Sequence, residues 1–535
     1  MSLPAKRKHS EAESGTRSNE YIEIMDSTLR DGEQMQHGSF TSNEKLTIAK
    51  LLLEEVNVDR VEIASVKASK GEEQSVSTVL QWAHENKHAD RIEVLGFTDG
   101  KASADWIAGF GGRVMNLLAK GSLRHVTKQL RKTPEEHVRD IRDTVDYAAG
   151  RGLVCNIYFE DWSNGMIDSR DYVIFLLENL ASTPIKRYML PDTLGVLYPR
   201  QVSRFISELI ERFPGYHFDF HGHNDYGVAT ANTLAAVEAG VSGIHTTVNG
   251  VGERAGNTPL DEAVVNLHDF LGKKTSENEK KIYHMSETIE IFTGQRVAFN
   301  KPICGINVFT QTAGIHADGD QKANLYFTRL LPERFNRKRK YALGKLSGKS
   351  NLEYNLRELG IELSPDQKRL VLERVVKLGD RKEIITQEDL PYIISDVLET
   401  PQEHRFVIRS CVVVSSLGLK PMATVKLACK EEDSGEYTEY EESAQGDGGY
   451  DAFMNALRKI TQKLQFTIAT LEDYRISIPA GGKSDALVQC SITWRDDTTF
   501  VTKGVNPDQV MAAAEATEKM LNVVTLRRQA RGEGQ

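Results

Sequence analysis

The chain has 535 residues, which is too many for one ordinary hydrophobic core, so two or three domains are expected. Apolar residues make up 40% of the sequence and charged residues 27%, and no apolar run approaches the ~18 residues that a membrane span requires. We therefore expect a soluble protein. The net charge of -9 argues against a nucleic-acid partner, because binding to a phosphate backbone requires a concentrated basic surface.

The cysteines and the amino-terminal segment indicate a cytoplasmic protein. The five cysteines are scattered and form no Cys-x-x-Cys pair, which is typical of free thiols in a reducing compartment. Residues 1–20 are polar and lack the apolar segment of a signal peptide, so a disordered tail is expected there.

From residue 21 to about 250, short β-rich runs alternate with amphipathic helical segments, which is the pattern of a parallel sheet. Capping boxes support the helices, with Thr41 and Glu44 before one and Thr133 and Glu136 before another. Eight β/α units in this length predict an α/β fold of the (β/α)8 TIM-barrel type over residues 21–285. The predicted strands are 21–26, 60–65, 91–97, 114–118, 154–161, 187–192, 217–224 and 243–248.

Two further regions follow the predicted barrel. Residues 286–400 contain helical segments and a basic, loop-rich stretch, and we interpret them as a helical connector. Residues 401–535 are predicted to form a separate α+β domain, in which strands followed by a helix occur twice and suggest an internal duplication. The strands predicted there are 406–416, 423–430, 474–479, 486–494 and 498–505, with helices at 451–464 and 507–522.

Polar side chains follow several predicted strands at the end where the βα loops of a barrel carry function. His221 and His223 are two residues apart on the seventh strand, so both imidazoles are expected to point into the barrel lumen. Asp31 follows the first strand, and strands one and seven flank the eighth, so its carboxylate can join them. These residues predict a site for Mg, Mn or Zn. The alternative is a pair of histidines that is simply exposed or hydrogen-bonded in the core.

Two other features lie at the same end of the predicted barrel. Arg30 offers a cationic fork suited to a carboxylate or a developing enolate; alternatively, it forms a salt bridge with Glu160. The glycine-rich loop 250–257 follows the eighth strand, where barrels often bind phosphate through backbone amides. The alternative for this loop is a tight turn without a ligand.

Three sequence motifs carry a family resemblance: DSTLRDGEQ at 26–34, HGHNDYG at 221–227 and NGVGERAGNTPL at 249–260. Together they resemble the signature of the isopropylmalate, homocitrate and citramalate synthases, and the similarity extends from about Ile22 to the carboxyl terminus. The resemblance implies a metal-dependent acyltransferase that uses acetyl-CoA. It assigns the metal ligands (Asp31, His221, His223 and Asn257), the residues that hold the 2-oxo acid (Arg30 and Thr193) and an acetyl-CoA loop (Gly252, Glu253, Arg254 and Gly256).

The resemblance also implies that residues of the connector complete the active site. In such enzymes Glu160 belongs to the barrel site, whereas His316, Asp318 and Tyr326 reach the active site of the partner subunit, which implies a homodimer. Glu160, His316 and Tyr326 are the alternatives for the proton-transfer network that includes the base acting on the acetyl methyl group.

The side chain of the substrate is expected to face Leu95, Leu118 and Tyr158, unless these bulky residues are ordinary barrel core. In citramalate synthases the matching positions confine the methyl group of pyruvate, so the resemblance favours pyruvate over the 2-oxoisovalerate of 2-isopropylmalate synthases. His37 departs from the small or aliphatic residue that relatives tend to have, so the rim of the pocket is expected to differ. An acyl-CoA lyase and a non-catalytic amino-acid sensor are the alternatives from other classes.

Residues 401–535 are expected to form a dimeric regulatory domain that binds isoleucine, to which citramalate leads. The stretch GDGGYDAF at 446–453 brings glycine-rich backbone before a helix, which suits the binding of a carboxylate. The alternative is that the aliphatic residues of this region are domain core. The resemblance assigns the amino-acid site to Tyr450, Asp451, Leu471, Tyr474, Ile478, Val488, Pro507 and Gln509.

Overall fold

The computed structural model describes residues 20–36, 38–66, 69–380, 385–398, 404–431, 435–477 and 488–530. The chain divides into two compact units, Met1–Phe309 with Thr328–Lys338, and Thr310–Phe327 with Arg339–Gln535. Each unit contains hydrophobic cores of its own. The predicted tail, except for Glu20, lies outside the described residues, and so does His37.

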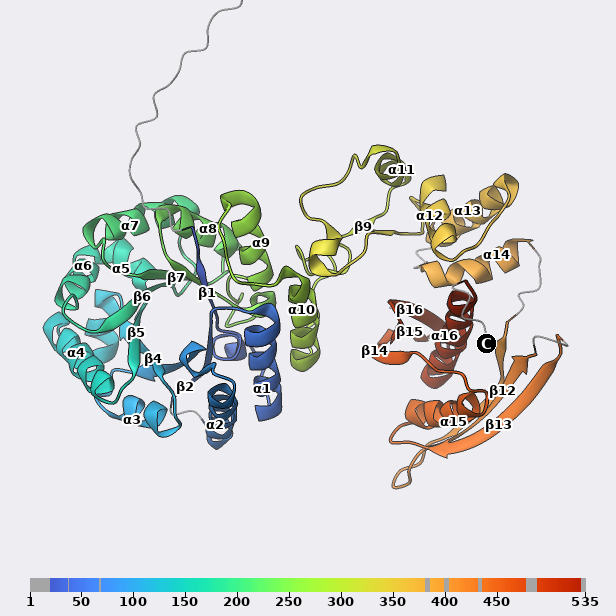
Figure 1. Cartoon of the computed structure of the whole chain (residues 1–535), viewed down its shortest axis with the longest axis horizontal. Helices are drawn as coiled ribbons and strands as arrows, with labels where there is room; N and C mark the ends of the chain where they lie inside the picture. The colour runs from blue at the N-terminus through green and yellow to red at the C-terminus, as the bar shows by residue number, and fades with distance from the viewer. Residues whose placement is uncertain are drawn as a thin grey trace, which may run out of the picture. The chain divides into compact units, whose positions relative to one another are not determined.

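The first unit contains a closed barrel of eight parallel strands, which confirms the predicted TIM barrel (Figure 1). The strands pair in chain order, and β1 closes the barrel against β8. The strands are β1 (Glu23–Asp26), β2 (Arg60–Ser65), β3 (Ile92–Phe97), β4 (Val114–Lys120), β5 (Val154–Glu160), β6 (Ile185–Asp192), β7 (Phe218–Gly222) and β8 (Gly243–Thr246).

Helices surround this barrel and bury apolar side chains in the core that they share with the strands. In α7 (Pro199–Arg212), Phe205 and Leu209 are buried one helical turn apart. The predicted capping boxes that begin with Thr41 and Thr133 are both present. The helices are α1 (Ser42–Lys50), α2 (Lys70–Glu85), α3 (Ala102–Gly109), α4 (Pro134–Gly150), α5 (Trp162–Asp168), α6 (Arg170–Asn179), α7 (Pro199–Arg212), α8 (Ala229–Ala239), α9 (Leu260–Leu271) and α10 (Glu279–Thr293). Short 3-10 helices are η1 (Gly32–Gln34), η3 (Ala89–Arg91), η5 (Val248–Gly250) and η6 (Pro332–Phe335), and π-helical segments are η2 (Leu51–Val56) and η4 (His125–Leu130).

The second unit begins with short strands and helices from the predicted connector. Leu352 and Leu356 of one helix and Val371 and Val375 of the next are buried in a small core. The elements are β9 (Thr310–Gln311), α11 (Gly314–Ala323), β10 (Lys340–Tyr341), α12 (Lys349–Glu358), α13 (Pro365–Asp380), η7 (Gln387–Asp389) and α14 (Leu390–Leu398).

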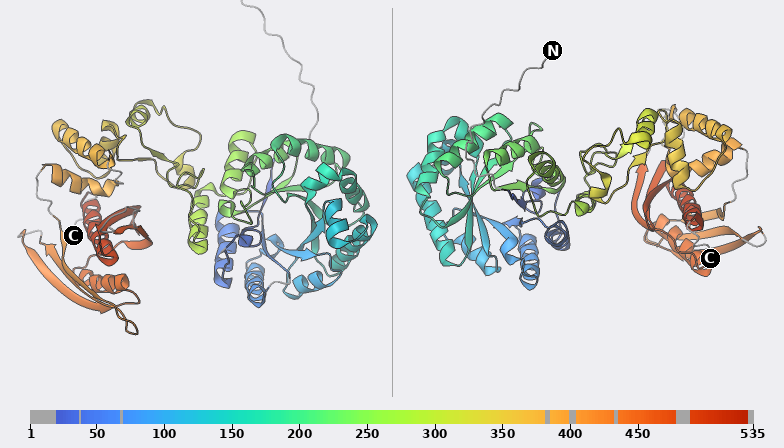
Figure 2. Two further views of the ribbon diagram at one scale, coloured as in Figure 1. Left: turned by 180° about the vertical axis from the view of Figure 1, so that it is seen from behind. Right: turned by 45° about the horizontal axis from the view of Figure 1, so that its top comes forward.

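Two antiparallel sheets of three strands, each followed by a helix, form the rest of the second unit (Figure 2). Helix α15 packs on β12 and β13, and α16 packs on β15 and β16. The repeated order agrees with the predicted duplication. The elements are β11 (Phe406–Val414), β12 (Met422–Lys430), β13 (Tyr437–Gln445), α15 (Gly449–Lys463), β14 (Thr470–Ser477), β15 (Val488–Arg495), β16 (Thr499–Asn506) and α16 (Gln509–Ala530).

Strand β13 is a correction to the sequence analysis, which predicts no strand between residues 430 and 451. Its sequence, YTEYEESAQ, alternates half-buried and exposed residues. Most of its half-buried positions are polar or small, so the sequence lacks the apolar alternation that indicates a strand. The strand is stabilised instead by pairing with β12, including ion pairs of Lys426 with Glu439 and Glu441.

No helix within the described ranges is both long enough and apolar enough to cross a lipid bilayer.

Candidate functional site

Three buried side chains converge at the carboxyl-terminal end of the barrel strands. His221 lies on β7, His223 follows that strand, and Asp31 lies in the loop after β1. The Asp31 carboxylate oxygen Oδ2 is 3.1 Å from His221 Nε2 and 3.8 Å from His223 Nε2. The two Nε2 atoms are 3.3 Å apart. Strands β1 and β7 both pair with β8 in the closed barrel. The fold therefore brings together residues that are far apart in sequence.

The donor atoms of this cluster fit a divalent cation. Asp31, His221 and His223 each offer one ligand atom within 4.8 Å of the others. Asn257 pairs through its backbone with His223, and its side-chain Oδ1 is buried without a hydrogen-bond partner among the described residues. One carboxylate, two imidazoles and an amide oxygen are a donor set that suits Mg, Mn or Zn.

The electrostatics of the cluster favour the metal-binding forms of Asp31 and His223. Burial alone would raise the pKa of the Asp31 carboxyl, but the Arg30 guanidinium and the two imidazoles outweigh it and hold that pKa below its usual range. Burial, together with neighbouring His221, lowers the pKa of His223 to about 4. Burial likewise lowers the pKa of His245, deeper in the lumen, to about 4. At neutral pH the cluster therefore offers a carboxylate and a neutral His223 imidazole.

The glycine-rich loop after β8 owes its shape to its glycines. Gly256 has a φ of +81°, and a Cβ there would lie 1.9 Å from the Gly250 carbonyl oxygen. Gly252 has a φ of +155°, and a Cβ there would lie 2.2 Å from Nδ2 of Asn257. Any larger residue at either position would displace the segment that carries Asn257.

Arg30 does not form the salt bridge with Glu160 that was the alternative in the sequence analysis. Its Nε donates to Glu62 Oε2 at 2.6 Å, and its Nη1 lies 3.3 Å from Asp31 Oδ2. Glu160 instead forms an ion pair with Lys120, its register partner on β4. Glu62 and Lys120 are absent from the sequence-based site. Both could have been found in the sequence as charged residues within or at the end of an otherwise apolar strand. Burying such a charge without a partner is costly, so its presence indicates an ion pair.

The three predicted wall residues meet inside the lumen. Leu95 and Tyr158 are buried and pack together with Met25 and Met189, and Leu118 packs against this group. The Tyr158 hydroxyl also accepts a hydrogen bond from Arg30 Nη2 at 3.3 Å. The apolar wall and the cationic fork are therefore adjacent.

Thr193 and Arg254 join the loops that follow β6, β7 and β8. The Thr193 hydroxyl accepts a hydrogen bond from the Asp161 backbone N–H at 2.9 Å. Arg254 donates to both carboxylate oxygens of Asp225 at 2.8 and 3.0 Å, and to the Thr193 carbonyl at 2.8 Å. Arg254 also pairs with Glu253, so its guanidinium already has a structural role at the rim.

The predicted connector residues belong to the second unit. His316 and Asp318 lie on α11, and the rings of His316 and Tyr326 are 4.3 Å apart between centroids. Asp318 accepts a hydrogen bond from Lys322 at 2.7 Å. These residues gather at one helix, and their participation in the barrel site of a partner subunit stays a prediction.

The predicted amino-acid site is only partly assembled from contacts in the structure. The rings of Tyr450 and Tyr474 are 5.0 Å apart, and the Tyr450 hydroxyl is 2.8 Å from Thr517 Oγ1. Asp451 accepts hydrogen bonds from the Asp447 backbone N–H and from Asn455. The remaining predicted positions are Leu471 on β14, Val488 on β15, Pro507 and Gln509 near the start of α16, and Ile478, which lies outside the described residues.

Comparisons with known proteins agree with this architecture. Residues 21–289 match the HMGL-like family, residues 303–383 the homocitrate synthase post-HMGL domain-like family, and residues 384–525 the LeuA allosteric (dimerisation) domain.

Two relatives are similar along nearly the whole chain. The (R)-citramalate synthase CimA of Methanocaldococcus jannaschii is 33% identical over 505 residues, covering 94% of this chain and 99% of that protein. The 2-isopropylmalate synthase of the same organism is 32% identical over 518 residues, covering 95% of each chain. The chain belongs to the HMGL-like family, in the group of acyltransferase-type enzymes that contains the citramalate and 2-isopropylmalate synthases.

Proposed function

We propose that this protein is an (R)-citramalate synthase that condenses acetyl-CoA with pyruvate and hydrolyses the thioester, in the route to isoleucine. The observation that carries the proposal is the metal-competent cluster of Asp31, His221 and His223 beside Arg30 and a bulky apolar wall. The relatives named citramalate synthase support it along most of the chain.

In this proposal the cluster and Arg30 bind the 2-oxo acid. A divalent ion held by Asp31, His221, His223 and Asn257 would supply Lewis-acid polarisation of the keto group. Arg30 holds the substrate carboxylate and offsets the negative charge that develops on the keto oxygen. The Thr193 hydroxyl accepts from backbone, so its own proton is available to donate to the substrate.

A base then removes a proton from the acetyl methyl group, and the resulting carbanion forms the new bond to the keto carbon of pyruvate. Glu160 is the candidate for this base within the barrel, and Lys120 fixes its carboxylate at the end of β5. His316 and Tyr326 of the partner subunit remain the alternatives. Water finally cleaves the thioester and releases CoA as a free thiol.

The volume of the wall favours pyruvate. Leu95 and Tyr158 are buried and pack together, and the Tyr158 hydroxyl is hydrogen-bonded to Arg30, so bulky side chains lie next to the residue proposed to hold the substrate. A tight wall excludes an added isopropyl group sterically, whereas a roomy pocket loses only ~0.8 kcal/mol for each methylene that a smaller substrate lacks. Selection of pyruvate over larger 2-oxo acids therefore needs bulky residues here.

The proposal includes a homodimer regulated by isoleucine. Its support is the match of residues 384–525 to the LeuA allosteric (dimerisation) domain, together with the contact of Tyr450 and Tyr474. Isoleucine fits the proposed product, because an end product of the route is the natural feedback signal.

The test is CoA thiol release from acetyl-CoA with pyruvate, 2-oxobutyrate, 2-oxoisovalerate and 2-oxoglutarate, each with Mg, Mn or Zn. The highest kcat/KM is expected with pyruvate. A clear preference for 2-oxoisovalerate would make the protein a 2-isopropylmalate synthase instead. Absence of release with every 2-oxo acid would contradict a synthase and favour a lyase or a sensor.

A further inference from the structure

Below the metal cluster, three buried polar residues form a continuous hydrogen-bonded chain across the barrel lumen. His245 on β8 lies between Asp219 on β7 and Tyr158 on β5. Its Nε2 is 3.2 Å from Asp219 Oδ2, and its Nδ1 is 3.1 Å from the Tyr158 hydroxyl. Buried polar groups are costly unless paired, so such a chain has one preferred arrangement of its protons.

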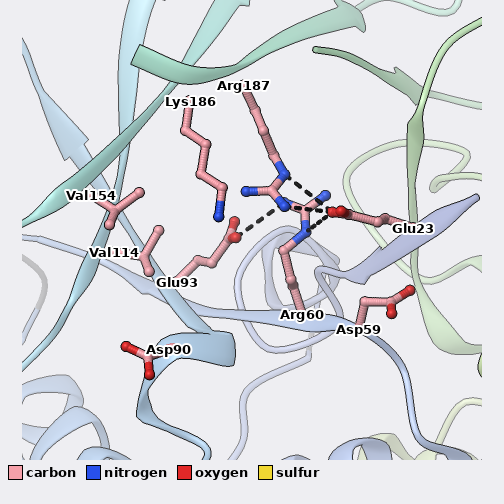
Figure 3. A pocket seen from close by; sticks show the side chains of 9 residues that line it. All are labelled: Glu23, Asp59, Arg60, Asp90, Glu93, Val114, Val154, Lys186 and Arg187. Carbon is pink, nitrogen blue, oxygen red and sulfur yellow. Dashed lines mark hydrogen bonds and ion pairs between the residues drawn. The ribbon is translucent and has the colours of Figure 1, made fainter. Parts of the chain in front are cut away.

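Asp219 fixes the lower end of this chain. Arg60 donates to Asp219 Oδ2 at 2.6 Å and to Glu93 at 3.0 Å. Figure 3 shows Arg60 held between Glu93 and Glu23 in a cavity at the amino-terminal end of the barrel strands. The arginine favours the charged form of the aspartate, which can then only accept hydrogen bonds.

The charge of Asp219 determines which nitrogen of His245 carries the proton. A neutral imidazole donates through one nitrogen and accepts through the other. Since Asp219 accepts only, Nε2 must donate to it, and Nδ1 must accept the proton of the Tyr158 hydroxyl. The hydroxyl oxygen is then left with lone pairs for a donor on its other side.

That donor is Arg30, the proposed substrate-binding residue. Its Nη2 donates to the Tyr158 oxygen at 3.3 Å, while its Nε donates to Glu62 at 2.6 Å. The Tyr158 oxygen also lies 3.4 Å from Glu62 Oε2. Without an acceptor at His245, the hydroxyl proton would turn to Glu62 and compete with Arg30 for that carboxylate.

We propose that Asp219 and His245 are positioning residues for the 2-oxo acid, which fix the Tyr158 side chain and the guanidinium of Arg30 without contacting the substrate. This role rests on the proposed synthase function. On this proposal, the preference for pyruvate depends on the hydrogen bonds of Asp219, His245 and Tyr158 as well as on the volume of the wall residues. The ring packing agrees, since the Tyr158 ring is edge-on to His245 at 5.4 Å and to His221 at 6.0 Å.

The matched variants are His245→Gln and His245→Leu in the full-length protein. Glutamine can donate to Asp219 through its amide nitrogen and accept from Tyr158 through its oxygen, whereas leucine fills similar space and can do neither. His245→Leu is expected to raise the KM for pyruvate about tenfold and to reduce the preference for pyruvate over 2-oxobutyrate. The KM for acetyl-CoA should change less than about twofold, and His245→Gln should restore most of the loss.

Tm, Mn2+ affinity and a comparison in a second background separate a positioning role from simple loss of stability. Tm and Mn2+ affinity are recorded for every variant, with His268→Gln on α9 as a control outside the barrel lumen. In a Tyr158→Phe background, the leucine and glutamine variants should become equivalent, because the hydroxyl that they orient is gone. If His245→Leu does not fold, Asp219→Asn serves in its place, since an uncharged amide can donate to the ring and reverse the direction of the chain.

Pyruvate affinity is also measured by calorimetry on the Mn2+-loaded proteins, which needs no turnover. Equal pyruvate affinity and KM for the leucine and glutamine variants would overturn the positioning role, and so would a difference that persists in the Tyr158→Phe background. A wild-type protein that releases no CoA would overturn the proposed function alone if the variants still differ in pyruvate affinity. A wild-type protein that binds no 2-oxo acid would overturn both.

Discussion

Replacement of Leu95 by alanine should shift the substrate preference from pyruvate toward 2-oxoisovalerate. Leu95 lies on β3, is 5% exposed and packs with Tyr158 in the lumen. Alanine lacks three of the leucine carbons, whereas 2-oxoisovalerate has two carbons more than pyruvate. At ~0.8 kcal/mol for each buried methylene, two accommodated carbons contribute ~1.6 kcal/mol, or roughly 15-fold in the ratio of the two kcat/KM values.

The assay is CoA thiol release with each 2-oxo acid at saturating acetyl-CoA, with the wild type measured in parallel. Leu117→Ala is the matched control, because Leu117 is also buried, on β4, but packs in the main core outside the lumen group. Both variants should lose stability, by ~2–5 kcal/mol for a buried leucine. Only Leu95→Ala should change the ratio. An unchanged ratio for this variant, or an equal change for the control, would refute the reasoning.

Three further predictions concern the metal, the effector and stability. Calorimetry should show that His223→Ala lowers Mn2+ affinity by more than the ~10–100-fold expected when a residue that only hydrogen-bonds to a metal ligand is lost. Near-normal turnover of this variant after chelator treatment would contradict the proposed metal ligands. Isoleucine should inhibit the full chain by changing the affinity for substrate ~5–150-fold. Tyr474→Ala should abolish this inhibition. Insensitivity of the wild type to both isoleucine and leucine would contradict the effector site. Burial raises the pKa of Glu277 from 4.5 to about 8, so its native carboxyl retains a proton that the unfolded chain releases. Stability should fall as pH rises from 4.5 to 8, by up to ~5 kcal/mol at 1.36 kcal/mol per pH unit. Glu277→Gln should flatten this dependence, as measured by Tm at pH 5.5 and 8.5, and a parallel dependence would show that Glu277 titrates normally.

The sequence alone predicted the barrel and the identity of its metal-competent cluster. The eight strand runs alternate with amphipathic helices, and this local periodicity reflects which face of each element is buried. Asp31, His221 and His223 could be named because each follows or ends a predicted strand, and barrel topology sends those ends to one face. The two carboxyl-terminal sheets were predicted less completely, since β13 carries too few apolar residues to show the alternation of a strand.

The partners of the site residues were decided by tertiary structure. Arg30 contacts Glu62 rather than Glu160, and Glu160 contacts Lys120, because strand register and the direction of each side chain select the neighbour. The chain from Asp219 through His245 to Tyr158 likewise joins three strands that are separated by long helical connections. A sequence shows which residues are charged and which way a strand alternates, but hydrogen bonds depend on distances of a few ångströms between segments, and these are set only when the barrel closes.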